Sequence, residues 1–447
     1  MKIVNNKSTV IILLILTSLF FAAQPSMQYR GVDTSAVIVI RNFNNPSQTG
    51  QIWSTLGGNT DRTGYQDTIG PKLANMIWTF NTGGWVVDSP IAVNDKVYFG
   101  SNDNKVYCLD GINGSKLWDF TTTGFVDSTP TIDSGKLFVG GHGQTFYCLD
   151  ADTGEMEWSF PAGNIIRTSS PAVMDGRVFF GCMDGKLYCL NTTTGAKLWD
   201  YTTGGQVHSS PLVTPDHVYI GSYDGKVYCL DPTDGSYQWN YSTGARIDTT
   251  SPALKDGKLY IGSDNGKVSC INAETGAFVW SYTTGARIIC SPSVSSDYVY
   301  IGSDDNKFYC LHASNGSVKW SYTTGNDIGW SCPALSNQYV YFGSADDKLY
   351  CLDAITGEKV WDYGMGDNVH SCALVGPYLY VSSINTNVYA FKGSSVTTTT
   401  TTSASSTNTN TTTSTIEAGG IDYTFIVLMA GGLILIIVIA IVAKNKP

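Results

Sequence analysis

The chain has 447 residues, of which 42% are hydrophobic and 12% aromatic, enough to bury a large core. Only 14% of the residues are charged, below the roughly 25% of an average globular chain, so Thr, Ser, Asn and Gly must make up much of the surface. A net charge of −10 and the lack of a basic run argue against nucleic acid and anionic lipid as partners, since both select clustered Lys and Arg.

The N-terminus has the pattern of a secretory signal peptide. Lys2 and Lys7 precede an apolar run over residues 10–23 that ends in small residues. We predict a signal peptide over 1–23, cleaved after Ala22 or Ala23; the alternative is a retained anchor. Residues 24–70 then form an N-terminal lead-in to the first repeat.

An internal repeat of 40 or 41 residues fills most of the chain. Each unit contains four short runs rich in Val, Tyr, Phe and Ile, as at 169–173, 177–181, 186–190 and 196–201. Asp-Gly and Thr-Gly turns separate the runs, which is typical of antiparallel hairpins. The repeat is marked by eight regularly spaced tryptophans: Trp78, Trp118, Trp158, Trp199, Trp239, Trp280, Trp320 and Trp361.

Four antiparallel strands per unit predict an all-β fold, an eight-bladed β-propeller over residues 71–392. Eight first strands can be counted, but the last unit has no tryptophan strand after it. The strand around Trp78 has no unit before it. We therefore predict that residues 73–82 supply the outer strand of the last blade, so that N- and C-terminal segments close the ring.

The C-terminal part changes character completely. Residues 393–420 are rich in Ser and Thr and have few apolar side chains to bury, so we predict a stalk. Residues 421–443 are mostly Ile, Leu and Val and precede two lysines, which predicts a transmembrane helix and a cytoplasmic tail over 444–447. The expected location is the cell membrane, single-pass, with the propeller outside; we expect an archaeal cell surface.

One motif carries a family resemblance. Leu149–Trp158 and Leu352–Trp361 resemble the pyrroloquinoline-quinone (PQQ)-like repeat, and Trp53–Gly64 resembles the segment that often precedes such propellers. The resemblance covers about residues 53–392 and implies that the tryptophans dock on the neighbouring blade. Trp118 through Trp361 would have this role, and we extend it to Trp78.

The resemblance raises the hypothesis of a PQQ-dependent alcohol dehydrogenase. In those enzymes adjacent cysteines form a disulfide at the cofactor, carboxylates and amides bind calcium, and an aspartate is catalytic. This chain has no Cys-Cys pair and no insertions between its evenly spaced repeats. We therefore expect no enzyme, no catalytic residue, no metal site, and neither PQQ nor calcium as cofactor.

The repeat varies most just before its Ser/Thr-Pro first strand. A position whose residue type varies between units, while the rest of the unit is repeated, is a candidate for a binding surface at the channel mouth. The alternative is that these are solvated residues at strand starts. The candidate residues are Asp127, Arg167, His208, Asp248, Trp330 and His370.

The sequence thus favours a non-catalytic binding or scaffolding module at the cell surface. The periplasmic propeller of the outer-membrane β-barrel assembly machinery is similar in architecture and is a protein scaffold, which supports this by analogy. Expected partners are an unknown protein or glycan, and the membrane through the C-terminal helix. The alternatives are a PQQ-dependent dehydrogenase and a structural component of the cell envelope.

The eleven cysteines fall into two groups. Seven share one repeat position within an apolar strand, as Cys189 does, and we interpret them as small buried hydrophobic residues. Among the other four, Cys332 and Cys372 hold the same inner-strand position in neighbouring blades. They are a candidate disulfide; the alternative is two free thiols.

Overall fold

The computed structural model describes residues 53–393 continuously, and residues 398–404, 410–418, 421–430 and 433–440 beyond them. The predicted signal peptide, the lead-in before Trp53 and the tail 444–447 lie outside the described residues. The chain divides into two compact units, one running from Gln48 to Ser394 and the other containing the remaining residues. Each unit is described by itself.

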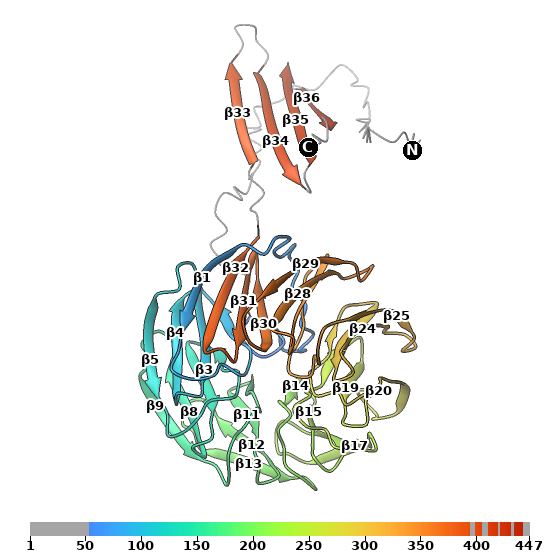
Figure 1. Ribbon diagram of the computed structural model, residues 1–447. Coiled ribbons are helices and arrows are strands. Elements are labelled where there is room, and N and C mark those ends of the chain that lie inside the picture. The colour runs from blue at the N-terminus through green and yellow to red at the C-terminus, as the bar shows by residue number, and fades with distance from the viewer. Residues whose placement is uncertain (1–52, 394–397, 405–409, 419–420, 431–432, 441–447) are drawn as a thin grey trace, which may run out of the picture. The chain divides into compact units, whose positions relative to one another are not determined.

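Within residues 53–393 the structure forms eight four-stranded antiparallel sheets arranged as a ring of blades (Figure 1). Blades one to seven take their strands consecutively, and the first of each four is innermost. The strands are β2 (Ile91–Val93), β3 (Lys96–Ser101), β4 (Lys105–Asp110), β5 (Lys116–Thr121); β6 (Thr131–Asp133), β7 (Lys136–Gly140), β8 (Thr145–Asp150), β9 (Met156–Pro161); β10 (Ala172–Met174), β11 (Arg177–Gly181), β12 (Lys186–Asn191), β13 (Lys197–Thr202); β14 (Leu212–Val213), β15 (Val218–Gly221), β16 (Lys226–Leu230), β17 (Tyr237–Ser242); β18 (Ala253–Lys255), β19 (Lys258–Gly262), β20 (Lys267–Asn272), β21 (Phe278–Thr283); β22 (Ser293–Val294), β23 (Tyr298–Ser303), β24 (Lys307–His312), β25 (Val318–Thr323); β26 (Ala334–Leu335), β27 (Tyr339–Ser344), β28 (Lys348–Asp353) and β29 (Lys359–Gly364).

Blade eight closes the ring with strands from both ends of the unit. It contains β30 (Val369–Val375), β31 (Tyr378–Ser383), β32 (Asn387–Lys392) and β1 (Met76–Asn81), in that order. Trp78 of β1 pairs with Ala390 of β32, and Phe80 pairs with Val388. The predicted closure is therefore confirmed. It follows from the missing tryptophan strand of the last repeat, whose edge would otherwise be exposed.

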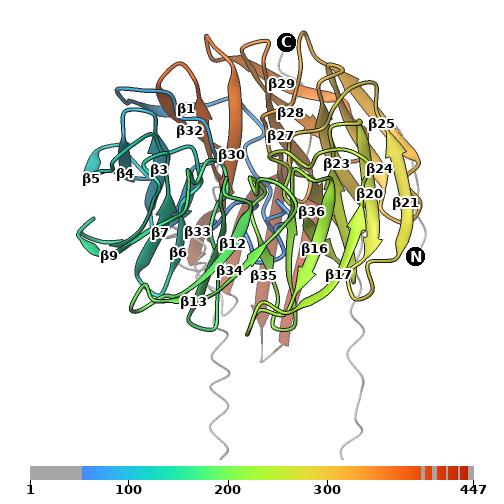
Figure 2. The ribbon, with the colours of Figure 1, turned by 90° about the horizontal axis from the view of Figure 1, so that it is seen from below.

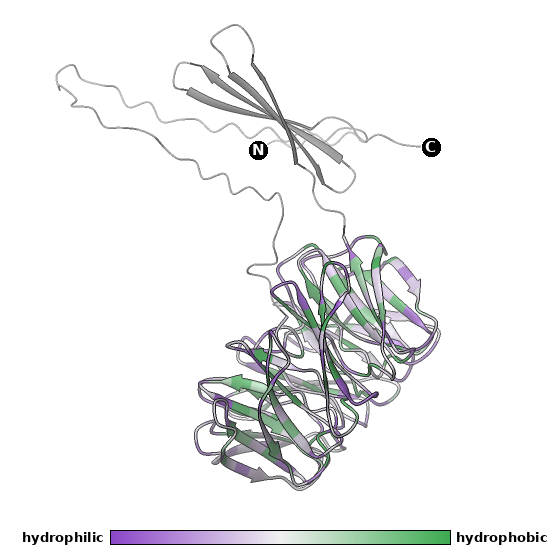
Figure 3. Ribbon diagram, turned by 90° about the vertical axis from the view of Figure 1, so that its left-hand side faces the viewer, coloured by the Kyte–Doolittle hydropathy of each residue, from purple (hydrophilic) through white to green (hydrophobic). Residues whose placement is uncertain are grey.

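The middle strands of each blade are buried on both faces, because the blades pack face to face around the ring. In β12 the four residues Leu187 to Leu190 are all buried, whereas in the outer strand β9 no side chain is fully buried. Figure 3 shows the hydrophobic residues on the strands and the hydrophilic ones mainly in the connecting loops. A continuous apolar run in a strand this short is what burial on two faces requires.

The tryptophans of the outer strands contact the following blade. Trp118 Nε1, in blade one, donates a 3.2 Å hydrogen bond to the carbonyl of Ala151 in blade two. Equivalent bonds, from 3.0 to 3.3 Å, join Trp78 to Gly111, Trp158 to Thr192, Trp199 to Pro232, Trp280 to Ala313, Trp320 to Ala354 and Trp361 to Pro71. Trp239 makes the same approach to Gly276, but its Nε1 has no partner.

Seven of these rings, all except that of Trp361, lie against a Thr-Gly or equivalent turn, which explains the glycine. At Gly195 (φ +69°) an added Cβ would lie 2.7 Å from the ring of Trp158, whereas at Gly257 (φ +70°) it would meet nothing within 4 Å. Gly257→Ala should cost about 1–2 kcal/mol for left-handed backbone alone. Gly195→Ala should cost about 1–3 kcal/mol more for overpacking. Guanidinium titrations of the two variants measure this difference, and equal costs would contradict the docking account.

The second unit contains a four-stranded antiparallel sheet in the order β33 (Thr398–Ala404), β34 (Asn410–Ala418), β35 (Ile421–Ala430) and β36 (Leu433–Ala440). Strands, and not the predicted transmembrane helix, occupy the described residues 421–430 and 433–440, and strands also occupy parts of the segment expected as a stalk. Two glycines stand between the paired Ala430 and Leu433, and a Gly-Gly link between runs rich in Ile and Val favours a hairpin. In the described part of the chain, no helix has the length and apolar character to cross a membrane.

Candidate functional site

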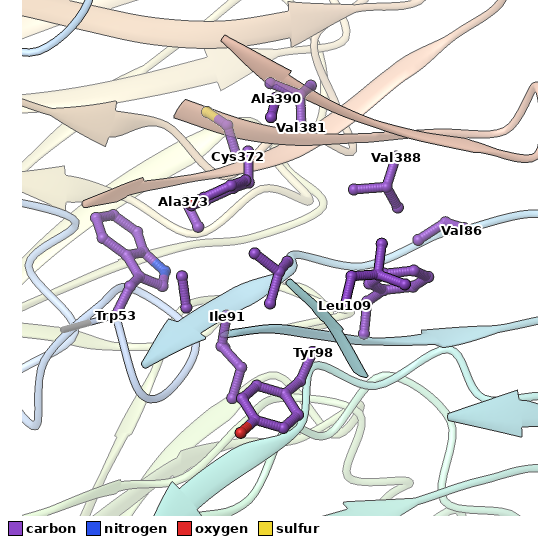
Figure 4. Close-up of a cluster of buried hydrophobic side chains, with 14 of the residues drawn as sticks. Trp53, Val86, Ile91, Tyr98, Leu109, Cys372, Ala373, Val381, Val388 and Ala390 are labelled. Carbon is purple, nitrogen blue, oxygen red and sulfur yellow. The ribbon is translucent and has the colours of Figure 1, made fainter. Parts of the chain in front are cut away.

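The lead-in closes one end of the central channel. It runs within the ring of blades (Figure 2), and its backbone bonds to successive inner strands. The bonds join Trp53 to Ala92, Ser54 to Ile132, Asp61 to Leu254, Thr63 to Val294 and Gly64 to Leu335. Trp53 is buried in one cluster with Ile91 of blade one and Ala373 of blade eight (Figure 4). The sequence of the lead-in carries a family resemblance but does not reveal this position.

Arg62 lies at the centre of this closure and is only 4% exposed. Its Nε donates to the carbonyl of Pro211 at 2.9 Å, and Nη2 donates to those of Ser170 and Pro171 at 3.3 Å. Burial lowers its pKa to about 10, although the nearby Asp88 carboxylate opposes this shift. Arg62 also has φ +52°, a conformation that the surrounding bonds must hold in place.

Serine hydroxyls join the inner strands across blade boundaries. Four serines that stand directly before a proline accept a hydrogen bond from the backbone N–H of the counterpart in the preceding blade. The distances are 3.0 Å from Thr129 to Ser170 and 2.9 Å from Ser170 to Ser210, from Ser210 to Ser251 and from Ser251 to Ser291. We call Ser170, Ser210, Ser251 and Ser291 the serine ring; each belongs to the Ser/Thr-Pro motif of the repeat. Their side chains link the backbones of neighbouring inner strands by one hydrogen bond each.

A cavity of about 30 Å³ remains between the serine ring and the mouth, the channel end opposite the lead-in. It is lined by Leu56, Val87, Asp88, Asp127, Thr168, Thr249, Ile289, Cys290, Ser291, Trp330 and Cys332. Leu56 comes from the lead-in, and Trp330, which is 37% exposed, reaches the surface. A cavity of this size holds about two water molecules.

Asp88 is the residue that sequence reasoning missed here. Its carboxylate accepts bonds from Ser89 N (2.8 Å), Thr129 N (2.9 Å) and Ser170 Oγ (3.2 Å). Burial raises its pKa to about 6, against the effect of these hydrogen bonds. The signal was present in the sequence: the other seven blades have Ser, Thr or Cys two residues before the proline or its alanine replacement, and only the first has a carboxylate.

The six predicted mouth residues do not form one cluster. Asp127 is 7% exposed and lines the cavity. One of its oxygens, Oδ2, lies 2.8 Å from His142 Nε2, whereas Oδ1 has no hydrogen-bond partner. Oδ1 is therefore a buried acceptor without a donor in the structure.

Arg167, His208 and Asp248 do lie together, with Tyr223. The Tyr223 hydroxyl donates to Asp248 Oδ1 at 2.5 Å, and His208 Nδ1 lies 3.3 Å from the same oxygen. Burial alone would raise the pKa of Asp248, but bonds from His208 and Tyr223, with the Arg167 charge, hold it below its usual value. The cluster balances its own charges and is consistent with a structural role in the mouth wall.

Trp330 and His370 form a separate pair, with ring centroids 6.1 Å apart. His370 is 6% exposed, and its Nδ1 donates to the carbonyl of Val87 at 2.6 Å. Because a carbonyl only accepts, the neutral ring carries its proton on Nδ1. Burial lowers the pKa of His370 to about 4, so it is neutral under physiological conditions.

His370 should make stability depend on pH. Its pKa falls from 6.5 to about 4 on folding, so the unfolded chain takes up the proton first. His370 should therefore lower the stability of the folded state by about 3 kcal/mol as the pH falls from 6.5 to about 4. Above pH 6.5 it should not change the stability. Asp88, with its raised pKa, acts in the opposite direction between pH 6 and 3.8, so wild-type stability alone would hide the effect.

The measurement is the difference in unfolding free energy between wild type and His370→Gln, in which the Asp88 contribution cancels. This difference should shift by about 3 kcal/mol in favour of the variant between about pH 7.5 and pH 4. A difference that stays constant with pH would show that His370 is solvated in the folded state.

All eleven cysteines are free, so the candidate Cys332–Cys372 disulfide is not formed. Cys332 lines the channel cavity, whereas Cys372 Sγ donates to the carbonyl of Tyr341 in blade seven at 3.4 Å. The two thiols lie in different surroundings, although the two residues hold equivalent positions in their inner strands. The seven cysteines of the repeat position are buried, as expected, and burial raises the pKa of Cys189 to about 12.

The residues do not fit a quinone cofactor with calcium. A cavity of about 30 Å³ is an order of magnitude smaller than the roughly 300 Å³ of small ligand pockets. A wider pocket of about 340 Å³ lies on the lead-in side, but Asp297 is its one carboxylate. Nowhere in the described ranges do three His, Cys, Asp or Glu side chains converge as metal ligands would.

The fold and site define a β-propeller with eight PQQ-like blades and a channel closed at one end by its own lead-in. A family model described as outer membrane protein assembly factor BamB matches residues 49–182 and 244–436, more than half of the chain. The chain therefore belongs to this PQQ-like, BamB-type propeller family. A second model, for the β-propeller of the beta-alanine-activating enzyme, matches residues 138–328.

Solved structures share the fold at low identity. BamB from Moraxella catarrhalis is 19% identical, with a TM-score of 0.62 over 72% of this chain and 100% of that one. The designed protein Ika8 is 17% identical (TM-score 0.65; 71% and 99% covered). Quinohemoprotein alcohol dehydrogenase from Comamonas testosteroni is 16% identical (TM-score 0.66; 79% and 83% covered). No curated protein matches the sequence.

Proposed function

We propose that this protein is a non-catalytic binding or scaffolding propeller at a cell surface, with the channel mouth as its binding face. The observation that carries this is the closed channel. The lead-in and the serine ring fill it, so that only a cavity of about 30 Å³ remains behind the mouth. The channel itself leaves little room for a substrate, which favours contacts at the mouth, where the repeat varies.

The exposed side chains around the mouth support contact with a partner. Trp85 and Phe125 are 56% and 47% exposed, in the loops that enter blades one and two. Arg246 and Arg287, at the equivalent places in blades five and six, pair with Asp264 and Asp304. The mouth therefore presents exposed aromatic residues at blades one and two and ion pairs at blades five and six, and a protein or a glycan could contact both. Aromatic side chains and Arg are enriched in protein interfaces.

Two experiments test this against the alternatives. Crosslinking on intact cells, followed by mass spectrometry, should recover a partner other than this protein; recovery of its own copies alone would favour a structural envelope component. Adding PQQ and calcium to the purified protein should give no dye-linked alcohol oxidation. Clear turnover would make it a dehydrogenase and contradict the proposal.

We also propose attachment to the membrane through the uncharged apolar residues 423–443. A segment of this composition gains free energy by leaving water. The protein should sediment with the membranes of its own cells and resist extraction with alkaline carbonate. Quantitative release by carbonate would contradict the attachment and leave the mouth proposal unaffected.

A further inference from the structure

The blades contain acceptor triplets for N-glycosylation. In the propeller residues that the structure describes, Asn-X-Ser/Thr triplets with X other than Pro begin at Asn113, Asn191, Asn240 and Asn315. Such a triplet is the acceptor that an exported chain offers for an N-linked glycan. Because triplets arise often by chance in a chain rich in Ser and Thr, the surroundings of each asparagine decide which of them can carry a glycan.

Asn113 and Asn315 hold the same place in blades one and six. Asn113 lies in the β4–β5 turn and Asn315 in the β24–β25 turn, and both are exposed. Each precedes a glycine of positive φ, Gly114 at +76° and Gly316 at +74°, and each glycine packs against the ring of a docked tryptophan. The tryptophan thus fixes the turn from inside, and the asparagine lies on its solvent side.

In both turns the asparagine amide contacts the hydroxyl residue of its own triplet. Asn113 Oδ1 accepts a 2.8 Å hydrogen bond from Ser115 N. Asn315 Oδ1 accepts bonds from Ser317 N at 2.9 Å and from Ser317 Oγ at 2.8 Å. These bonds engage the amide oxygen and not Nδ2, the atom to which a glycan is attached, so a glycan would leave them intact.

The other two asparagines are less suitable. Asn191 is half-buried, and its Oδ1 accepts three hydrogen bonds, of 2.9 to 3.1 Å, from Thr193 and Thr194. Asn240 is exposed but lies in the strand β17, and its Nδ2 donates to the Tyr237 hydroxyl at 2.8 Å. One side chain is therefore partly covered, and in the other the fold already uses the nitrogen that would carry the sugar.

Both favourable turns lie on the lead-in side of the propeller. Gly111 N, in the β4–β5 turn, donates to the carbonyl of Asp95 at 2.7 Å, and Ala313 N, in the β24–β25 turn, donates to that of Asp297 at 2.8 Å. Asp95 and Asp297 lie in the turns that follow the inner strands β2 and β22, and both strands bond to the lead-in. The mouth is at the opposite end of the inner strands.

We propose that Asn113 and Asn315 carry N-linked glycans, which cover part of the lead-in side and leave the mouth bare. In the transfer, Nδ2 forms a bond to the anomeric carbon of a sugar activated as a glycosyl phosphate. The bond from that carbon to the phosphate oxygen breaks, the phosphate leaves with the electron pair, and the amide releases one proton. The inference rests on the proposed location at the cell surface, because N-glycosylation is a modification of exported chains.

Mass spectrometry of tryptic glycopeptides, from protein isolated from its own cells, tests the assignment. Each asparagine falls in a separate tryptic peptide: Asn113 in 106–116, Asn191 in 187–197, Asn240 in 227–246 and Asn315 in 308–319. We expect glycan masses on peptides 106–116 and 308–319 and none on the other two. The lack of a glycan on either of the first two, or a glycan on either of the others, overturns the proposal.

Ser115→Ala removes the hydroxyl of one triplet and keeps its asparagine. Ser115 is exposed, and its bond to Asn113 comes from the backbone, so the turn should keep its structure. The variant should lose the glycan from peptide 106–116 and retain the one on 308–319. Ser115→Thr, the matched control, should retain both. A glycan that persists in Ser115→Ala would show that the triplet does not direct the modification, and the proposal would fail.

The bare mouth is tested with both glycans removed, in the double variant Ser115→Ala and Ser317→Ala. A photoreactive residue in place of Phe125, at the mouth, should form the same crosslinked adduct on intact cells with and without the glycans. Loss of the adduct in the double variant would place the glycans in the binding face and overturn this part of the proposal. If no peptide carries a glycan while the mouth adduct forms, the inference fails and the proposed function stands.

Discussion

Arg62→Met is expected to lower the free energy of unfolding by about 3–5 kcal/mol, because it removes one member of a buried, hydrogen-bonded charge system. The guanidinium satisfies the carbonyls of Ser170, Pro171 and Pro211 from two blades. Without it these acceptors lose their donor, and Asp88 loses its nearest positive charge. The lead-in should then separate from the inner strands. Guanidinium titration followed by near-ultraviolet circular dichroism measures the change.

Arg246→Met provides the control for this prediction. Arg246 is 56% exposed and forms an ion pair with Asp264, so its loss should cost less than about 1 kcal/mol. If Arg62→Met cost no more than Arg246→Met, the lead-in would not be an integral part of the fold. The account of a channel closed by its own chain would then be wrong.

Trp78→Ala should cost about 3–5 kcal/mol, the usual loss for a large buried aromatic side chain. Trp78 lies in the strand that closes the ring, is 8% exposed, and donates to the carbonyl of Gly111 in blade one. Its ring lies 5.9 Å from that of Tyr380 in its own blade. The substitution therefore weakens both the closing blade and its contact with the first.

Trp85→Ala is the matched control, since Trp85 is 56% exposed at the mouth. Its loss should change stability by less than about 0.5 kcal/mol. Denaturation midpoints of the two variants, measured side by side, give the comparison. Similar midpoints would mean that closure by β1 contributes little to the stability of the ring.

The repeat allowed most of the fold to be predicted, because each blade repeats the same four strands and turns. Trp78 without a unit before it and the last repeat without a tryptophan strand were enough to predict the closure. The C-terminal segment was less well predicted. Apolar Ile and Val are compatible with a helix or with strands, and the structure forms strands β35 and β36 there.

The candidate site was predicted only in part. Asp127 and Trp330 do line the cavity, whereas His208 and Asp248 do not line it and lie against each other, with Nδ1 3.3 Å from Oδ1. Arg62 could not be found by comparing repeats, since it lies outside them, and its contacts join residues more than 100 positions apart. Asp88 could have been found as the one carboxylate in a column of Ser, Thr and Cys.

Site-specific photocrosslinking on intact cells tests the central claim, that the mouth is the binding face. A photoreactive residue replaces Phe125 at the mouth, and in a second protein it replaces Ile112, which is 53% exposed in the β4–β5 turn on the lead-in side. The account predicts a discrete adduct with another molecule from position 125 and none from position 112. The same adduct from both positions, or an adduct from position 112 alone, would contradict it.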